Sequence, residues 1–326
     1  MSRKKILNKN NHIISDLWID KPYALDELTR RVDEGHIRPE LKSSFKDFIQ
    51  KGYCVLDLNL TDEFSSHTVS EAWKLLENKP KDLLAASVNE RNGRLSPSHH
   101  FNDLTNKNGI RLIDAHSHSQ NLLSLSLHEK LHDFYFSATE KTPVATQSLY
   151  FPRGSTQSLH RDPCYVVTSP VPYLMAAWIA LEDIHIDSGP LMYVPGSHRL
   201  PYNPLNTGDI IFHEPGVTDT SKKNHMEALK SEIEKIKLPT EFFTPKMGQA
   251  LIWHHSLVHG GAPVNDETLT RNSYVIHFDA KDNHLNHAQS VFLDDDDSSQ
   301  VFRTQHIDER KGRYSFGNPF EIEKNK

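Results

Sequence analysis

The sequence predicts a mainly β protein with flanking helices, in which an antiparallel sandwich or barrel follows an α-helical N-terminal part. Before Pro143, apolar residues recur at the spacing of amphipathic helices, and after it short β-type runs are separated by Pro, Gly, Asn and Asp. No Gly/Ser or Pro linker divides the 326 residues. We therefore expect one domain overall, with a helical region over 1–142, a β core over 143–280 and a polar segment over 281–326.

Amphipathic stripes predict the helices. Apolar residues recur at i, i+3, i+4 or i+7 in each predicted helix, so that one face is buried. In one of them this face is made by Phe45, Phe48 and Ile49. The helices are predicted within residues 24–50, after a cap at Thr61 or Asp62, over 121–139, and near 225–237 as an insertion in the β core.

Short β-type runs predict the strands. A half-buried strand is expected over 53–58, where apolar residues alternate with others. After Pro143, strands are expected over 144–151, 164–168, 173–182, 190–194, 209–213, 241–244, 249–253, 256–259 and 272–278. Short strands at this spacing are typical of a sandwich or barrel. In the C-terminal segment, Asp294 to Asp297 are expected to form a solvated acidic loop.

Composition excludes several classes of partner. The net charge is −6 with neutral histidines, so nothing near neutral pH attracts nucleic acid or an anionic membrane. The longest apolar stretches, such as 174–181, are too short to span a bilayer. The only cysteines, Cys54 and Cys164, form no disulfide framework, which favours the cytoplasm. Oligomeric state is not readable from the chain.

The 21 histidines indicate chemistry only where their spacing is specific. Non-haem oxygenases hold Fe(II) with two histidines and one carboxylate. A His-x-Asp tripeptide supplies two such ligands, because residues i and i+2 of an extended chain point the same way. The sequence contains four of these tripeptides: His160/Asp162, His185/Asp187, His277/Asp279 and His306/Asp308. Only the first directly follows a predicted strand and turn.

The residues downstream of His160 strengthen this interpretation. His259 lies 99 residues further on, in a β-like run that ends in Gly-Gly, and Arg271 follows after another 12 residues. His255, on the same strand face, and His254 are the alternatives to His259.

Longer motifs in the same order carry a resemblance to a known family. The chain reads LHRD, then AAWIALEDIHIDSGPLMYVPGSHR, GQALIWHHSLVHGGAPV and TRNSYVIHF, over roughly residues 143 to 280. In this region it resembles the phytanoyl-CoA dioxygenase-like (PhyH) family of Fe(II)/2-oxoglutarate-dependent oxygenases. Upstream of about residue 110 the similarity is only general.

The resemblance implies a double-stranded β-helix, or jelly roll, with helices packed outside. It makes His160, Asp162 and His259 the catalytic iron ligands. Arg271 would bind the distal carboxylate of the cosubstrate 2-oxoglutarate, a task suited to the guanidinium fork. Further cosubstrate contacts would come from Ser273, two residues on, from Trp178, for which a simple core role stays open, and from Gln147, which could instead pair with backbone.

Substrate contacts are predicted from position alone. Close in sequence to the turn that carries His160 and Asp162 (the metal turn) are Arg153, Arg161 and Tyr165, which could bind a polar or anionic group of the substrate. His116 belongs to the polar segment 98–120, which forms either a lid over the active site or a solvated connection.

The expected activity is that of a dioxygenase that uses Fe(II), 2-oxoglutarate and O₂. It would hydroxylate a small-molecule or carrier-linked metabolite and release succinate and CO₂. Asp162 argues against halogenation, because related halogenases have a small residue there. Desaturation and epimerisation use the same ligands and stay open. A non-catalytic jelly-roll binding protein and a cupin-like metal enzyme without 2-oxoglutarate are the alternatives from other classes.

Overall fold

A computed structural model describes most of the chain. The described residues are 6–326 without 89, 91–94, 106–107, 167, 169, 213–214, 287–289, 293–298, 304–306, 311, 317–319 and 325–326. Over 284–308 and at most positions beyond 313, only the backbone is described. The predicted acidic loop at Asp294 to Asp297 and the histidine of the fourth His-x-Asp tripeptide, His306, lie outside the described residues.

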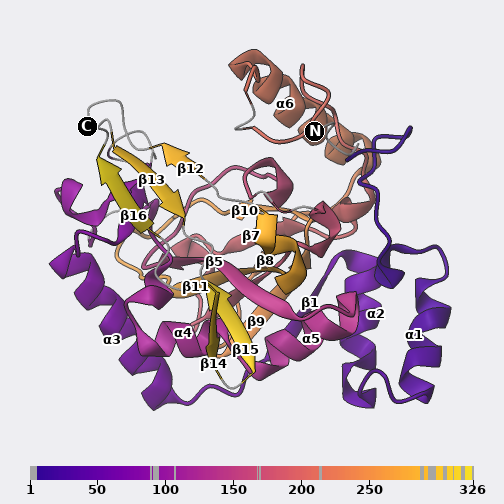
Figure 1. Ribbon diagram of the computed structural model, residues 1–326, viewed down its shortest axis with the longest axis horizontal. Coiled ribbons are helices and arrows are strands. Elements are labelled where there is room, and N and C mark those ends of the chain that lie inside the picture. Colours follow the sequence, from indigo (N-terminus) through magenta and orange to yellow (C-terminus); the bar gives the residue numbers. More distant parts are fainter. Residues whose placement is uncertain are drawn as a thin grey trace.

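Two antiparallel sheets form the β core (Figure 1). The main sheet has the order β1 (Tyr53–Asp57), β9 (Gln249–His254), β6 (Met175–Ala180), β11 (Ser273–Ala280), β5 (Pro143–Phe151), β4 (Ile110–Ile113), β2 (Leu84–Ser87) and β3 (Ser96–Pro97). The second sheet has the order β10 (Val258–Gly261), β7 (Leu191–Val194) and β8 (Glu241–Phe243). The region 1–142 therefore supplies four strands of the main sheet in addition to its helices.

The C-terminal segment adds short strands. A hairpin of β14 (Ile307–Arg310) and β15 (Arg313–Phe316) joins the main sheet, where β15 runs parallel to β5. A separate sheet has the order β12 (Ser290–Phe292), β13 (Ser299–Arg303) and β16 (Phe320–Lys324).

The helices are α1 (Ala24–Asp33), α2 (Lys42–Lys51), α3 (Asp62–Asn78), α4 (Gln120–Ser126), α5 (Glu129–Thr139) and α6 (Asp219–Ile236). The Thr61 hydroxyl caps α3 by accepting a hydrogen bond from the Phe64 N–H, as predicted. In Figure 1, α6 lies apart from the other helices. Its Leu229 and Ile233 pack against Val194 and Val258 of the second sheet. Among the described residues, no helix combines the length and the apolar character needed to cross a membrane.

The main sheet is buried on both faces. On β11, Tyr274, Ile276 and Phe278 belong to the core shared with α2 to α5. Val275, which alternates with them, packs inward with Trp178, Leu251 and Trp253 against Tyr193 and Phe243 of the second sheet. This second cluster is the interior of a jelly roll, so side chains in phase with Val275 face the space between the two sheets.

Three element predictions were wrong in the described residues. The described residues within 164–168 and 209–213 form no strand. Phe212 instead packs on Cys164 as irregular chain, and its N–H donates to the Cys164 carbonyl at 2.9 Å. The predicted helix 121–139 is two helices, because the chain becomes extended at His128. The apolar stripe continues across this break because both helices bury the same face in one core. A short apolar run thus predicts that its residues are buried, but not whether they form a strand, because that depends on the backbone hydrogen bonds they make.

Candidate active site

His160 and His259 lie side by side. Each accepts the other's backbone N–H, with His160 N to His259 O at 2.9 Å and His259 N to His160 O at 3.0 Å. This single antiparallel bridge joins the turn after β5 to strand β10. Directly opposed residues of a bridge project to one side, and the two ring centroids are 4.5 Å apart.

Asp162 completes a cluster with the two histidines. Its Oδ1 lies 3.3 Å from His259 Nε2 and 3.8 Å from His160 Nε2. All three side chains are buried, and their ligand atoms lie within 4.8 Å of one another. Among the described residues, neither His185/Asp187 nor His277/Asp279 forms such a group, and His185 is exposed.

Backbone contacts orient both imidazoles for metal binding. His160 Nδ1 lies 2.8 Å from the Ser158 carbonyl, and His259 Nδ1 lies 3.0 Å from the Leu257 carbonyl. A carbonyl only accepts, so each Nδ1 donates its ring proton to the backbone and each Nε2 faces Asp162. This donor set, two imidazole Nε2 atoms and one carboxylate, fits Fe(II).

The charges of the three groups are coupled. Burial alone would lower the pKa of His259, but the charge of Asp162 and a hydrogen bond to it raise that pKa, and a metal ion would take the place of the proton between them. Burial, reinforced by His259, lowers the pKa of His160 to about 3, so the ring is neutral at pH 7. Burial alone would raise the pKa of Asp162, but His259 and hydrogen bonds from His259 and His277 outweigh it and hold that pKa well below its usual range. The carboxyl group is therefore ionised, as a metal ligand must be.

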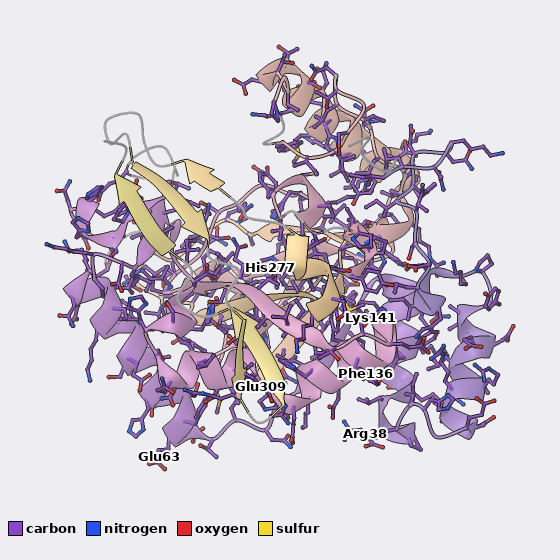
Figure 2. The ribbon with its side chains drawn as sticks, viewed as in Figure 1. Arg38, Glu63, Phe136, Lys141, His277 and Glu309 are labelled. Atoms are coloured by element: carbon purple, nitrogen blue, oxygen red, sulfur yellow. The ribbon has the colours of Figure 1, made fainter. Side chains whose placement is uncertain are left out.

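Two further side chains hold the outer oxygen of Asp162. Trp253 Nε1 donates to Asp162 Oδ2 at 2.7 Å, and His277 Nε2 lies 3.8 Å from the same oxygen. Figure 2 labels His277 near the middle of the molecule. Trp253 was not among the residues predicted for the site. Its spacing could have indicated it, because Trp253 lies two residues after Leu251 on β9, and both side chains face the jelly-roll interior.

The Gly-Gly after His259 has a steric reason. A Cβ on Gly260 would lie 2.7 Å from the Gln157 carbonyl oxygen, and one on Gly261 would lie 2.1 Å from Ser155 Oγ. No side chain fits at either position unless the metal turn moves. The two glycines therefore let β10 approach the turn closely enough for the bridge between His160 and His259 to form.

Arg271 lies in the same jelly-roll interior. Its guanidinium carbon lies 5.3 Å from the ring centre of Phe151 and 5.6 Å from that of Trp178, and one terminal nitrogen donates to the Gly189 carbonyl at 2.9 Å. Burial lowers the pKa of Arg271 to about 9, but it is still protonated at pH 7. Within the described part of the chain, its Nε and the Ser273 hydroxyl are buried without hydrogen-bond partners. Buried donors of this kind fit a carboxylate.

Glu182 fixes the start of the strand that carries Ser273. Its two carboxylate oxygens accept from the Asn272 backbone N–H at 2.6 Å and from the Asn272 side-chain amide at 2.9 Å. The Thr270 hydroxyl donates to the same carboxylate at 2.9 Å. These bonds to both neighbours of Arg271 give the Leu-Glu-Asp motif a positioning role for the arginine.

The other predicted cosubstrate residues also face the interior. Trp178 packs in the inner cluster next to Arg271. Gln147 pairs with His277 across β5 and β11 and is partly exposed. Because directly opposed residues share a sheet face, Gln147 lies on the side of Asp162.

The four residues predicted to contact the substrate lie in four different surroundings. Tyr165 is 40% exposed and its ring lies edge-on to His160, with centroids 5.3 Å apart. Arg153 donates to the carbonyls of the 267–269 loop. Arg161 is buried over the Tyr202 ring and donates to carbonyls of the 197–201 turn. His116 contacts Ser148, whose neighbours belong to the outer core, so it lies on the opposite face of the main sheet.

Arg111 is a cation that faces the site from β4. Ile113, two residues after Arg111 on β4, pairs with the inward-facing Leu149. Because residues i and i+2 of a strand point the same way, Arg111 also lies on the inner face. Its charge acts on His160 and Tyr165, and burial lowers its own pKa. Among the described residues, no carboxylate pairs with it. Such a cation beside the metal ligands fits an anionic group.

Family comparison agrees with this arrangement. The model of the family described as phytanoyl-CoA dioxygenase (PhyH) matches residues 50–271, more than half of the chain. The chain belongs to this family. The Danio rerio protein "Phytanoyl-CoA dioxygenase domain-containing protein 1" is 27% identical to this PhyH chain over 154 residues, 43% of this chain and 46% of the relative. The Mus musculus protein of that name is 31% identical over 87 residues, 26% of this chain and 30% of the relative. This chain thus spans less than half of the length of either relative.

Solved structures share the fold. The non-heme α-ketoglutarate-dependent carbocyclase SnoK has a TM-score of 0.54 and 14% identity, covering 80% of this chain and 86% of its own. EctD from S. alaskensis, with 2-oxoglutarate and 5-hydroxyectoine, has a TM-score of 0.54 and 17% identity, covering 78% and 79%. The α-ketoglutarate-dependent epimerase SnoN has a TM-score of 0.51 and 18% identity, covering 93% and 99%. The predicted family and mainly β jelly-roll fold are confirmed, and both support the Fe/2-oxoglutarate oxygenase class.

Proposed function

We propose that this PhyH protein is an Fe(II)- and 2-oxoglutarate-dependent dioxygenase that hydroxylates a small-molecule or carrier-linked metabolite. One observation carries the proposal. The interior of the jelly roll holds two imidazole Nε2 atoms and one carboxylate within 4.8 Å of one another, and the same interior holds Arg271 with an unpartnered Nε. An Fe(II) site next to a carboxylate site is what this class requires.

Each residue then has a defined task. His160, Asp162 and His259 would hold Fe(II), and Arg271 with Ser273 would bind the distal carboxylate of 2-oxoglutarate. When bound, iron and 2-oxoglutarate supply the activation of O₂, with release of succinate and CO₂. Trp253 keeps Asp162 in place through its indole N–H.

The surrounding side chains prepare the cosubstrate pocket. Trp178 packs beside Arg271, and Phe151 and Val275 belong to the same apolar cluster. Because this lining excludes water, the charge of Arg271 is poorly screened and attracts a carboxylate strongly. Gln147 would add a polar contact from β5.

On the substrate side, Arg111 and Tyr165 lie next to His160. We infer that an anionic group of the substrate, or the cosubstrate carboxylate nearest the metal, binds Arg111. Arg153, Arg161 and His116 stay weaker substrate predictions. Both cysteines are free and buried, which suits the reducing cytoplasm that we propose as the location.

Succinate release tests the proposal. The purified chain, given Fe(II), 2-oxoglutarate and O₂, is expected to release more succinate with the true substrate than without it. Anaerobic Fe(II) and 2-oxoglutarate should also give a visible charge-transfer band. His160→Gln is the matched control. No band, together with succinate release equal to that of this variant, would falsify the proposal and favour a non-catalytic jelly roll.

A further inference from the structure

A second group of two histidines and one aspartate lies outside the active site. Asp20 ends the short 3₁₀ helix Trp18–Asp20, His254 is the last residue of β9, and His255 begins the turn toward β10. Their ligand atoms lie within 4.8 Å of one another. Among the described residues, two groups of three metal-ligating side chains are this close together, and the other is the active-site triad.

Hydrogen bonds define the state of His254. Its Nδ1 accepts from the Ser256 backbone N–H at 3.1 Å, so its Nε2 carries the ring proton. This Nε2 lies 2.9 Å from Asp20 Oδ1. The other Asp20 oxygen accepts from the Ser15 hydroxyl. A metal ion bound here would replace the single proton between His254 and Asp20.

His255 supplies the observation that points to a ligand. It is 3% exposed, and its Nδ1 lies 2.7 Å from Ser256 Oγ. Its Nε2 is buried and has no hydrogen-bond partner in the described structure. A buried imidazole nitrogen without a partner is available to bind a metal ion.

His198 is a neighbour outside the group of three residues whose ligand atoms lie within 4.8 Å of one another. Its ring centroid lies 5.3 Å from that of His254. However, its Nδ1 abuts Gly52, where a Cβ would lie 2.5 Å away, and its Nε2 lies 3.3 Å from the Ile49 carbonyl. Both nitrogens are thus directed at α2 and its C-terminal glycine.

We propose that Asp20, His254 and His255 form a second metal site, for Zn²⁺ or a similar divalent transition-metal ion. Two imidazoles and a carboxylate are a common donor set for Zn²⁺, whose fourth position can be taken by water. The ion would fasten the N-terminal 3₁₀ turn to the connection that leads to His259 on β10. The proposal does not depend on the proposed oxygenase function.

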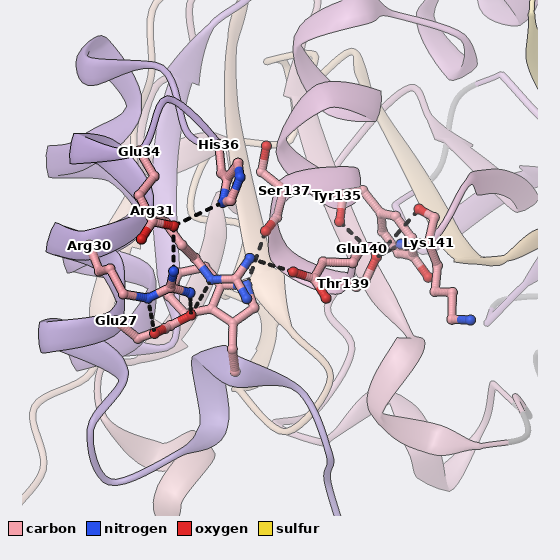
Figure 3. A network of polar contacts seen from close by, with 11 residues as sticks. Glu27, Arg30, Arg31, Glu34, His36, Tyr135, Ser137, Thr139, Glu140 and Lys141 are labelled. Atoms are coloured by element: carbon pink, nitrogen blue, oxygen red, sulfur yellow. Dashed lines mark hydrogen bonds and ion pairs between the residues drawn. The ribbon is translucent and has the colours of Figure 1, made fainter.

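The N-terminal turn is already positioned for such a site. Trp18 Nε1 donates to the Ser137 carbonyl at 3.0 Å, and the Arg31 guanidinium lies 4.8 Å above the Trp18 ring. Figure 3 shows the polar network that joins Arg31 of α1 to Glu27 and to Glu140 after α5. Because these contacts order the turn without a metal, the ligands are preorganised, which favours binding.

Zinc stoichiometry tests the proposal. In the full chain carrying His160→Ala and His259→Ala, which removes both active-site imidazoles, dialysis against ZnCl₂ followed by metal analysis should find one Zn²⁺ per chain. Adding Asp20→Asn or His255→Gln should weaken this binding by more than about 10-fold, because each removes a direct ligand. Adding His198→Gln, a neighbouring half-buried histidine outside the ligand set, should leave it unchanged. Circular dichroism checks that each variant is folded.

The same measurement on the chain with an intact active site covers a failure of the double variant to fold. Two Zn²⁺ per chain are expected there, and one after Asp20→Asn. A folded double variant that binds no Zn²⁺, or Zn²⁺ binding that Asp20→Asn and His255→Gln leave unchanged, would overturn the proposal. If the active-site triad binds no metal at all, the intact chain would bind one Zn²⁺ and lose it on Asp20→Asn, so failure of the oxygenase proposal is distinguishable.

Discussion

The two metal-type clusters of this protein have the same composition and different surroundings. Both contain two histidines and one aspartate within 4.8 Å. In the active-site triad, both Nδ1 atoms donate to backbone carbonyls, so both Nε2 atoms face the third ligand, Asp162. In the Asp20 cluster, His254 Nδ1 is itself an acceptor, so its Nε2 carries a proton and binds Asp20. The backbone around each ring therefore decides which cluster is ready for Fe(II).

The two aspartates differ in the same way. Asp162 is 4% exposed, and its second oxygen accepts from an indole in an apolar interior. The Asp20 side chain is 18% exposed, and its second oxygen accepts from a serine hydroxyl. The Asp162 cluster shares its interior with Arg271, whose Nε has no hydrogen-bond partner in the described structure. Ligand identity alone therefore does not separate a catalytic cluster from a structural one.

The largest expected difference comes from removing one histidine from each cluster in separate variants. His160→Gln should lower succinate release by about 100-fold or more, because loss of a direct iron ligand exceeds the loss caused by an outer contact. His255→Gln should leave it within about twofold, because His255 does not touch the triad. Steady-state succinate assays measure both. Equal losses in the two variants would contradict the assignment of separate roles.

Arg271 lies in the interior that also holds the active-site triad, next to Trp178. Arg271→Leu should raise the KM for the cosubstrate by about 100-fold, because charge-assisted hydrogen bonds to a carboxylate are lost. Ser273→Ala should raise it by about 10-fold. Titration of the charge-transfer band of iron and 2-oxoglutarate gives the affinities independently. Unimpaired cosubstrate binding in Arg271→Leu would favour a cupin-like enzyme that needs no 2-oxoglutarate.

The indole contact that only Asp162 has can be removed by itself. Trp253→Phe keeps the ring and deletes the N–H that donates to Oδ2. We expect a loss of iron affinity of about 10-fold, the lower range for an outer-contact substitution. Trp18→Phe deletes an indole hydrogen bond far from the triad and is the matched control. Equal iron affinities of Trp253→Phe and the unsubstituted chain would show that Asp162 needs no such support.

Arg111 on β4 gives the active-site triad a cationic neighbour. Arg111→Leu should raise the KM for an anionic substrate by about 10-fold and leave the KM for the cosubstrate unchanged, since one charged hydrogen bond is lost. Arg111→Lys should recover part of the effect, because the charge returns without the guanidinium fork. Steady-state kinetics with each of the two compounds varied in turn measure both constants. A rise confined to the KM for the cosubstrate would instead assign Arg111 to cosubstrate binding.

The smallest expected effect concerns stability near the Asp20 cluster. Burial, reinforced by His254 and Arg199, lowers the pKa of His198 to about 3. The unfolded chain therefore takes up a proton that the folded chain refuses, so this stability is complete above about pH 6.5 and is lost as the pH falls toward 3. Between pH 7 and roughly pH 5, the metal-free chain should lose about 1–2 kcal/mol more unfolding free energy than His198→Gln. Urea unfolding at both pH values measures it, with the exposed-site variant His185→Gln as control; identical pH slopes in His198→Gln and the unsubstituted chain would contradict the prediction.

Much of the candidate site was readable from order and spacing along the chain. The His-x-Asp pair, His259 before Gly-Gly, and Arg271 follow one another in a fixed order, and the structure brings His160, Asp162 and His259 within 4.8 Å of one another. The buried stripe of Phe45, Phe48 and Ile49 in α2 and the cap of α3 at Thr61 were also readable, because helices depend on contacts three or four residues apart. His259 is distinguished from His255 by the glycines, which the close approach of β10 requires.

Other features were decided only by the tertiary structure. Trp253 reaches Asp162 across 91 residues, Arg111 reaches the vicinity of His160 from β4, and Asp20 meets His254 across 234 residues. No local period encodes such contacts, because they depend on which strands pair and which turns dock. The sequence thus determined the family, the ligand types and the helices. The tertiary structure decided which nitrogen of each histidine is free, and so which of two equal ligand sets can serve as the active site.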